Sequence, residues 1–304
     1  GLFLQSCQAQ NVLQKSAVNK SAKLANTYAN AEVLTLSNQL QSKVAEVLPA
    51  SVLIITHEYL AGHKGMMASG VSVTEDGVIL TAGHMVIPGG NYEIVFPDGE
   101  KVAAKGYGKI GNLDVGILKI SEKGKYPFAE MGSTLNLKMG EPCFSLAYPG
   151  SFPSKMVVRF GQVLKLNATR FGSMQTTCLM EPGDSGGPVF DMDGKVIGIR
   201  SYIGMPLDEN YEIPVDFYKK YWSALQNQVD YHQLPEEDSL VPISARKADA
   251  ILWPELMASV QKQGINLNRY AVRIESEIAG SVQTIVGALI NLDGLTDKKN
   301  FLNY

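Results

Sequence analysis

Between residues 51 and 203 the chain repeats one local pattern, in which short runs rich in β-branched residues are separated by glycine turns. The turns EDG, PDG and DMDG, which end at Gly77, Gly99 and Gly194, are typical of hairpins because aspartate and glycine tolerate the backbone angles of tight turns. No helical pattern interrupts these runs. Many short strands at even spacing predict an all-β fold, either a sandwich or a pair of barrels.

Helical patterns flank this β region. Before it, apolar residues recur at spacings of three and four, which predicts an amphipathic helix that ends at Pro49 and packs on the β domain; they are Val33, Leu36, Leu40, Val44, Val47 and Leu48. After it, residues 213–226 predict a helix that begins near Asp216 and closes the β unit.

These patterns divide the chain into residues 1–48, an export remnant and helix; 49–226, the β domain; and 227–304, a linker plus a partial C-terminal domain. Within the last part, an acidic, proline-bearing linker precedes a helix predicted from Pro254 to Gly264, and residues 270–294 return to a β pattern. That pattern weakly repeats residues 51–77. It indicates either the start of a second, related β unit or an unrelated small α+β extension.

Composition excludes several classes of function. The 304 residues carry 27 basic and 30 acidic side chains without a clustered basic patch, so we expect no nucleic-acid partner. The three cysteines show no CxxC spacing, and Cys143 and Cys178 are expected to be buried free thiols. His57 and His63 are six residues apart in a predicted hairpin, which does not suit a helical zinc motif. We therefore expect neither a metal nor a cofactor.

The N-terminal stretch GLFLQSCQAQ is typical of the end of a secretory signal. It predicts an exported protein, periplasmic or secreted. Because LQSC also resembles a lipobox, Cys7 is a candidate lipid anchor and the expected route to a membrane. The alternative is a plain apolar terminus.

One serine stands among glycines in EPGDSGGPVF, residues 181–190. This stretch also fits G-x-S-x-G, but an α/β-hydrolase needs a helix after the serine and the chain order Ser, Asp, His. After Ser185 only His232 remains, and the following segment reads as a β hairpin. Upstream, His84 in ILTAGHMV ends an apolar strand and Asp114 in NLDVGILKI begins one. The order His84, Asp114, Ser185 is the order of chymotrypsin.

These residues suit acyl transfer. Ser185 is the candidate nucleophile, His84 the base that takes its proton, and Asp114 the carboxylate that orients the base. The backbone N–H groups of Gly183 and Ser185 are the candidate oxyanion hole, because glycine permits the loop conformation that aims both at one point.

The motifs LTAGHMV, NLDVGILKI and PGDSGGPVFDMDGKVIGI together resemble those of trypsin-like serine proteases, most closely the HtrA/Deg type. The resemblance implies two packed, antiparallel, six-stranded β-barrels with the site between them, and a serine endopeptidase acting on protein or peptide substrates. It also implies a substrate pocket walled by Leu179, Met180, Arg200, Ser201, Tyr202 and Ile203. Because Leu179 rather than an aspartate stands six residues before Ser185, we expect cleavage after medium apolar residues.

The chain departs from that family in two places. Asp184 stands where HtrA-type proteins usually have asparagine. In digestive trypsins the aspartate at this place pairs with a newly cleaved N-terminus. The sequence does not indicate which group pairs with Asp184 in this chain. Residues 227–304 lack the glycine-rich carboxylate-binding loop of a PDZ domain. A latent protease-fold protein that binds or scaffolds without cleaving is the alternative function.

Overall fold

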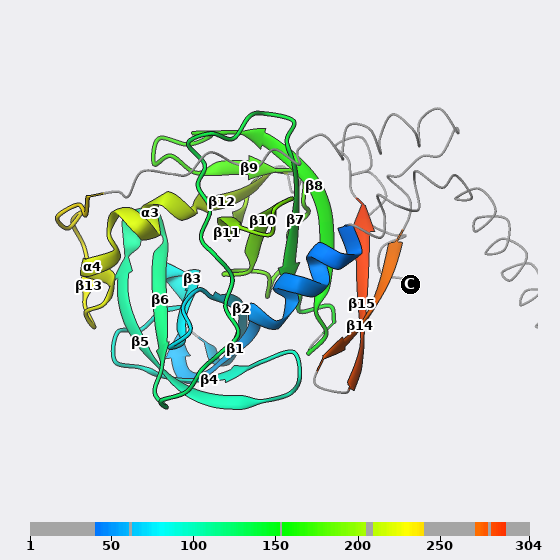
Figure 1. Cartoon of the computed structure of the whole chain (residues 1–304). Coiled ribbons are helices and arrows are strands. Elements are labelled where there is room, and N and C mark those ends of the chain that lie inside the picture. The colour runs from blue at the N-terminus through cyan, green and yellow to red at the C-terminus, as the bar shows by residue number, and fades with distance from the viewer. Residues whose placement is uncertain are drawn as a thin grey trace, which may run out of the picture.

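The computed structural model describes residues 40–60, 63–152, 154–204, 209–239, 271–278 and 281–289. Most of them form two closed antiparallel β-barrels (Figure 1). The first barrel has the strand order β5-β4-β1-β2-β3-β6 and closes by pairing β5 with β6. Its strands are β1 (Ser51–Leu60), β2 (His63–Ser72), β3 (Val78–Ala82), β4 (Asn91–Val95), β5 (Lys101–Ile110) and β6 (Val115–Ile120).

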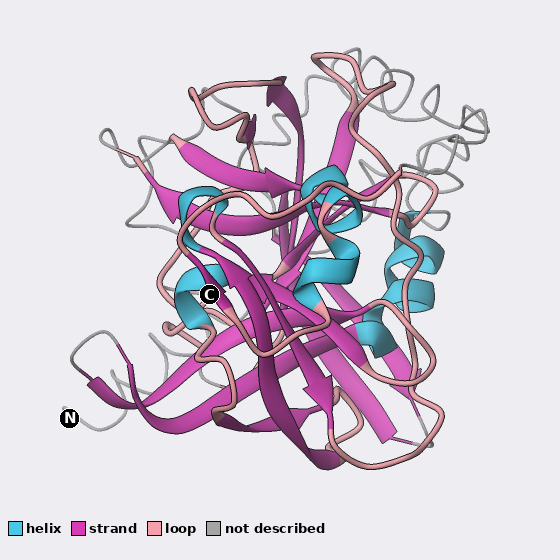
Figure 2. Cartoon of the chain, turned by 90° about the vertical axis from the view of Figure 1, so that its left-hand side faces the viewer, coloured by secondary structure: helices cyan, strands magenta, loops and turns pink. Residues whose placement is uncertain are grey.

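The second barrel has the order β8-β7-β10-β11-β12-β9 and closes by pairing β8 with β9. Its strands are β7 (Pro142–Ala147), β8 (Val157–Lys165), β9 (Met174–Thr176), β10 (Pro188–Asp191), β11 (Val196–Ile203) and β12 (Asn210–Pro214). Figure 2 shows how far strands outweigh helices in the described chain. The predicted fold of two six-stranded barrels is confirmed.

The segment after the last barrel strand corrects one expectation. Residues 213 and 214, predicted to open a helix, instead end β12, and the helical part divides into α3 (Val215–Lys220) and α4 (Trp222–Leu225). The backbone leaves helical geometry at Tyr221, where ψ is 24°. The short strand β13 (Asp230–Tyr231) then pairs in parallel with β5. Part of the predicted linker is thereby held against the first barrel.

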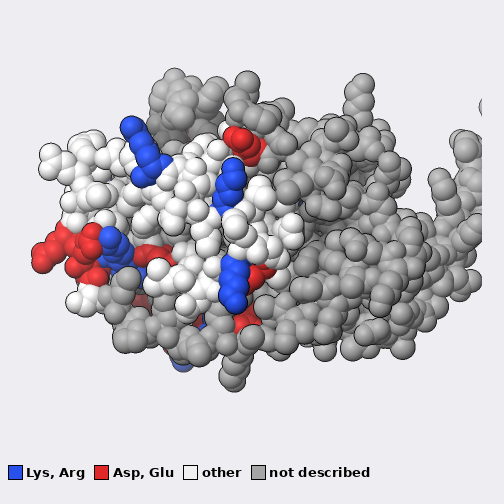
Figure 3. Space-filling view, turned by 90° about the horizontal axis from the view of Figure 1, so that it is seen from above, with Lys and Arg blue, Asp and Glu red and all other residues white. Residues whose placement is uncertain are grey.

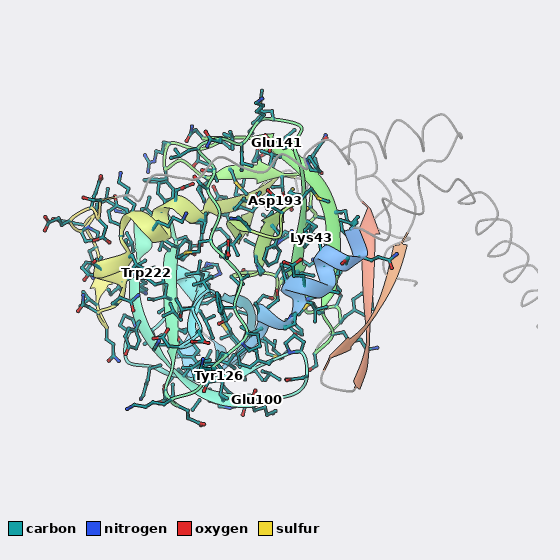
Figure 4. All side chains as sticks on the ribbon, in the orientation of Figure 1. Lys43, Glu100, Tyr126, Glu141, Asp193 and Trp222 are labelled. Carbon is teal, nitrogen blue, oxygen red and sulfur yellow. The ribbon has the colours of Figure 1, made fainter. Side chains whose placement is uncertain are left out.

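The N-terminal helix covers residues 40–47 of the described chain and leads into the 3-10 turn η1 (Leu48–Ala50). Leu40, Val44 and Val47 from the predicted apolar stripe are buried. The helix packs near the β10–β11 turn, where a Cβ on Gly194 would stand 3.0 Å from Val47; Figure 4 labels Lys43 and Asp193 at this contact. The remainder of the predicted helix, and Cys7, lie outside the described residues.

In the C-terminal part, β14 (Ala271–Ile278) and β15 (Ser281–Leu289) pair as an antiparallel hairpin, and β15 runs parallel to β8. The predicted β pattern there is confirmed as strands, while its kinship to the first β unit stays a prediction. The helix predicted from Pro254 to Gly264 lies outside the described residues, and the domain boundaries remain predictions.

Glycine turns and buried apolar side chains account for the barrels. The three predicted hairpin glycines, Gly77, Gly99 and Gly194, all have positive φ, between 78° and 92°. Inward-facing apolar residues fill both barrels, and the buried Cys143 and Cys178 are free thiols, as expected, with their sulfurs 4.0 Å apart.

Candidate active site

His84 and Asp114 meet because glycines let their backbones come close. His84 lies in the turn η2 (Gly83–Met85) after β3, and Asp114 follows the turn η3 (Gly111–Leu113) before β6. A Cβ on Gly83 would stand 2.8 Å from the carbonyl oxygen of Val115, and one on Gly116 would stand 2.9 Å from the Cα of Gly83. Side chains at either glycine would therefore hold the two turns apart.

The Asp114 carboxylate accepts hydrogen bonds from the backbone and the ring of His84. Its Oδ1 accepts from the His84 N–H at 2.7 Å, and Nδ1 of the ring lies 3.1 Å from Oδ1 and 3.0 Å from Oδ2. Asp114 has φ of 56°, a left-handed conformation that aspartate tolerates better than most residues. With Nδ1 facing the carboxylate, Nε2 is the nitrogen left for a proton donor.

The loop that carries Ser185 is fastened to the first barrel. On β2, the Ser69 N–H donates to the Ser185 carbonyl oxygen at 2.9 Å, and the Ser69 hydroxyl donates to the Gly183 carbonyl oxygen at 2.9 Å. On β3, the Thr81 hydroxyl donates to the Ser69 carbonyl oxygen at 3.0 Å. The strand that leads into the turn with His84 is thus linked to the loop that holds Ser185.

Two glycines permit this loop conformation. Gly183 has φ of 97° and Gly186 has φ of 85°, where a residue with a Cβ is strained. A Cβ on Gly186 would stand 2.1 Å from both the Ser69 carbonyl oxygen and the Thr81 hydroxyl. The N–H groups of Gly183 and Ser185 find no acceptor among the described residues, so both are free to donate to a ligand.

Ser201 makes a contact that the sequence does not indicate. Its hydroxyl donates to Oδ2 of Asp114 at 2.5 Å, so the carboxylate receives a donor from the second barrel as well. Ser185 Oγ contacts the Ser201 carbonyl oxygen at 3.4 Å, which is long for a hydrogen bond between oxygens, and forms none with His84 in the described part of the chain. The sequence predicted only a role for Ser201 in the substrate pocket.

The six predicted pocket residues divide by burial. Leu179 and Ile203 are half-buried, and Tyr202, which is 46% exposed, stacks on the Tyr211 ring with centroids 4.6 Å apart. Met180 and Ser201 are buried, and the side chain of Arg200 turns into the second barrel. There it donates to the Ser145 hydroxyl at 2.5 Å and to the carbonyl oxygens of Cys178 and Leu179. Of the six, only Leu179, Tyr202 and Ile203 therefore have side chains with appreciable exposed surface.

Asp184, whose partner the sequence left open, is fully buried. Its Oδ2 lies 2.8 Å from Nη1 of Arg159, which is also fully buried on β8. The contact is an ion pair rather than a well-aligned hydrogen bond, since Nη1 has no hydrogen-bond partner of good geometry in the described residues.

Among the described residues visible in Figure 3, most of the surface is uncharged, and the charged side chains include both signs. Exposed ions often pair, as Lys125 does with Glu75 at 2.9 Å. The described residues hold no cluster of three His, Cys, Asp or Glu that could bind a metal ion. None of the helices among them is long and apolar enough to cross a membrane.

Comparison with known proteins identifies the domain. Residues 68–199 match the family model of the trypsin-like peptidase domain. The chain is 30% identical over 245 residues to a probable periplasmic serine endoprotease DegP-like of Bartonella henselae, covering 74% of this chain and 48% of that protein. It is 28% identical to serine protease HTRA1 of Xenopus tropicalis, covering 63% of this chain and 44% of that protein. The chain thus spans about half the length of these relatives.

Solved structures agree in fold. An HtrA-type protease AlgW with tripeptide matches with a TM-score of 0.54 at 22% identity, covering 60% of this chain and 62% of that one. A serine endoprotease from Yersinia pestis matches with a TM-score of 0.52 at 23% identity, covering 62% of this chain and 65% of that one.

Proposed function

Because the chain carries a trypsin-like peptidase domain and is similar to HtrA-type serine proteases, we propose that it is a serine endopeptidase whose triad is His84, Asp114 and Ser185. The observation that carries the proposal is the approach of the His84 ring to the Asp114 carboxylate at 3.0 Å, together with a loop whose Gly183 and Ser185 N–H groups have no acceptor among the described residues.

In the proposed reaction, Ser185 Oγ attacks the carbonyl carbon of the scissile peptide bond while its proton passes to Nε2 of His84. The peptide C–N bond then breaks as His84 returns that proton to the leaving nitrogen, which leaves an acyl-enzyme. Water repeats the sequence to release the acid. Asp114 orients the ring and stabilises its charged form, and Ser201 orients Asp114.

The N–H groups of Gly183 and Ser185 would stabilise the developing oxyanion. The peptide planes that contain these two N–H groups are held through their carbonyl oxygens, because the Pro182 carbonyl oxygen accepts the Gly150 N–H at 2.7 Å and the Asp184 carbonyl oxygen accepts the Gly187 N–H at 2.9 Å. Preorganised donors of this kind contribute more than flexible ones, because they need no reorientation during the reaction.

We expect medium apolar residues at the cleaved position. Leu179 and Ile203 present half-buried apolar side chains, and no acidic residue stands six positions before Ser185. Along residues 201–203, beyond the last paired residues of β10, β11 has an edge to which an extended substrate could add as a strand. A cleavage profile dominated by basic or acidic residues would contradict this specificity.

Because the similar DegP-like proteins are named periplasmic, we propose an exported protein that acts on protein or peptide substrates. The test is cleavage of an unfolded protein by the purified chain and by Ser185→Ala, with Ser121→Ala as the control at an exposed serine. We expect Ser185→Ala to lose activity by roughly 10⁴-fold or more and Ser121→Ala to keep it. Unchanged cleavage by Ser185→Ala would refute the mechanism.

One observation favours a second candidate, a protein of this fold that binds polypeptides without cleaving them. Ser185 Oγ lies 3.4 Å from the Ser201 carbonyl oxygen and forms no hydrogen bond with His84 among the described residues. A fluorophosphonate probe separates the two, because a reactive Ser185 becomes labelled and a latent one does not.

A further inference from the structure

The residue before the proposed nucleophile is an acid in a dry environment. Asp184 is fully buried, and its Oδ2 accepts the Glu181 N–H at 2.8 Å. Moving a carboxylate out of water costs several kcal/mol unless an opposite charge accompanies it. Arg159, with Nη1 at 2.8 Å, provides that charge, and Nη2 of Arg200 is more distant at 4.0 Å.

The same guanidinium holds the other end of the loop. Nη2 of Arg159 lies 3.1 Å from Oε1 of Glu181, so one side chain binds both the first and the fourth residue of the turn 181–184. The turn itself is closed by the Asp184 N–H, which donates to the Glu181 carbonyl oxygen at 3.0 Å. Burial alone would lower the pKa of Arg159, but Asp184 and Glu181 raise it above its ordinary value, so Arg159 remains charged.

The turn contains Gly183, whose N–H direction matters most for the proposed chemistry. Downstream, the chain is already fixed, because the Gly186 N–H donates to the Arg200 carbonyl oxygen at 2.8 Å and the Gly187 N–H to the Asp184 carbonyl oxygen at 2.9 Å. If the Asp184 carboxylate lost its partner, it would have to turn toward water or take up a proton. The resulting displacement would concentrate at Gly183, where glycine offers little conformational resistance.

We propose that Arg159 is a positioning residue for catalysis, whose guanidinium binds Glu181 and Asp184 and so holds the Gly183 and Ser185 N–H groups in their reactive directions. This inference rests on the proposed peptidase function. Because β8 of the same domain supplies the counter-charge, the reactive loop forms on folding and needs no newly cleaved N-terminus to order it.

The test compares Arg159→Met with the double variant Arg159→Met/Asp184→Asn, and uses Arg170→Met at an exposed arginine as the matched control. Rates of fluorophosphonate labelling, kcat and KM for a peptide are measured per folded molecule, with the folded fraction taken from thermal unfolding. We expect Arg159→Met to lower labelling and kcat by roughly 10²- to 10³-fold, comparable with loss of an oxyanion donor, and to change KM less than about threefold.

The double variant should regain at least roughly tenfold in labelling, because an amide at position 184 carries no charge that must leave the interior. If Arg159→Met does not fold, Glu181→Gln, which alters the partly exposed end of the turn, should lower kcat about three- to tenfold. A purely structural role would lower the melting temperature and leave kcat per folded molecule unchanged.

Two outcomes would overturn the inference while the proposed function stands: a labelled wild-type protein whose Arg159→Met variant labels equally fast, or a double variant that recovers nothing. Absence of labelling in the wild-type protein would overturn both proposals.

Discussion

Replacing Glu212 with glutamine should stabilise the folded protein at neutral and alkaline pH. Glu212 lies on β12 with no exposed surface, and its Oε1 accepts the Thr176 hydroxyl at 2.8 Å. Burial raises the pKa of this carboxyl to about 8, although Arg200 on the neighbouring strand acts to lower it. The folded protein therefore holds a neutral carboxylic acid in the second barrel where the unfolded chain would be ionised.

The direction of the pH dependence follows from the proton count. The folded state keeps a proton on Glu212 that the unfolded state releases above about pH 4.5. The contribution of Glu212 to the free energy of unfolding is therefore fully present below that pH and is lost as the pH rises toward 8. The pKa of Glu212 differs by about 3.5 between the folded and unfolded states. At about 1.4 kcal/mol per pKa unit, the free energy of unfolding falls by about 5 kcal/mol over this pH range. Glutamine does not titrate, so the Glu212→Gln variant should lack this loss.

Urea unfolding at pH 5, 7 and 8.5 measures the difference. We expect the wild-type protein and Glu212→Gln to be close in stability at pH 5 and the variant to lead by about 3–5 kcal/mol at pH 8.5. Glu130→Gln, at a side chain that is 70% exposed, is the control and should follow the wild-type curve. Parallel curves for Glu212→Gln and wild type would show that Glu212 is ionised in the barrel, and the reasoning from burial would be wrong.

Two further substitutions test how the site is held. Gly186→Ala should destabilise the fold by about 2–5 kcal/mol and abolish probe labelling, because the residue has positive φ and the new Cβ would stand 2.1 Å from neighbouring atoms. Gly140 has the same φ of 85° but open space around it, so Gly140→Ala is the control and should lower the free energy of unfolding by only about 1–2 kcal/mol. Equal losses would refute close approach as the cause. Tyr218→Phe removes the hydroxyl that donates to the Thr81 carbonyl oxygen at 2.7 Å and should cost about 1–3 kcal/mol. An unchanged melting temperature would contradict that estimate.

The β pattern predicted over residues 51–203 stops before β12 (Asn210–Pro214), and this strand shows the limit of pattern reading. In β12, the residues NYEIP alternate, but Asn210 and Glu212 are buried polar side chains. Alternation predicts a strand only when the buried positions are apolar, so the sequence pattern places residues 213 and 214 in the following helix instead. The burial of Glu212 is explained only by the tertiary structure, in which Thr176 donates a hydrogen bond to its carboxyl group and Arg200 lies opposite it on β11.

The sequence by itself determined an all-β domain and led to the proposed triad His84, Asp114 and Ser185, because strand periodicity, hairpin glycines and residue order are local or linear properties of the chain; the two six-stranded barrels were expected from the family resemblance. Only the tertiary structure decided what supports them. Ser69 reaches a loop 114 residues away, Ser201 reaches Asp114 across 87 residues, and Arg159 binds the acid beside Ser185. Such contacts depend on strand register and barrel closure, which bring distant side chains together without leaving a pattern in the sequence.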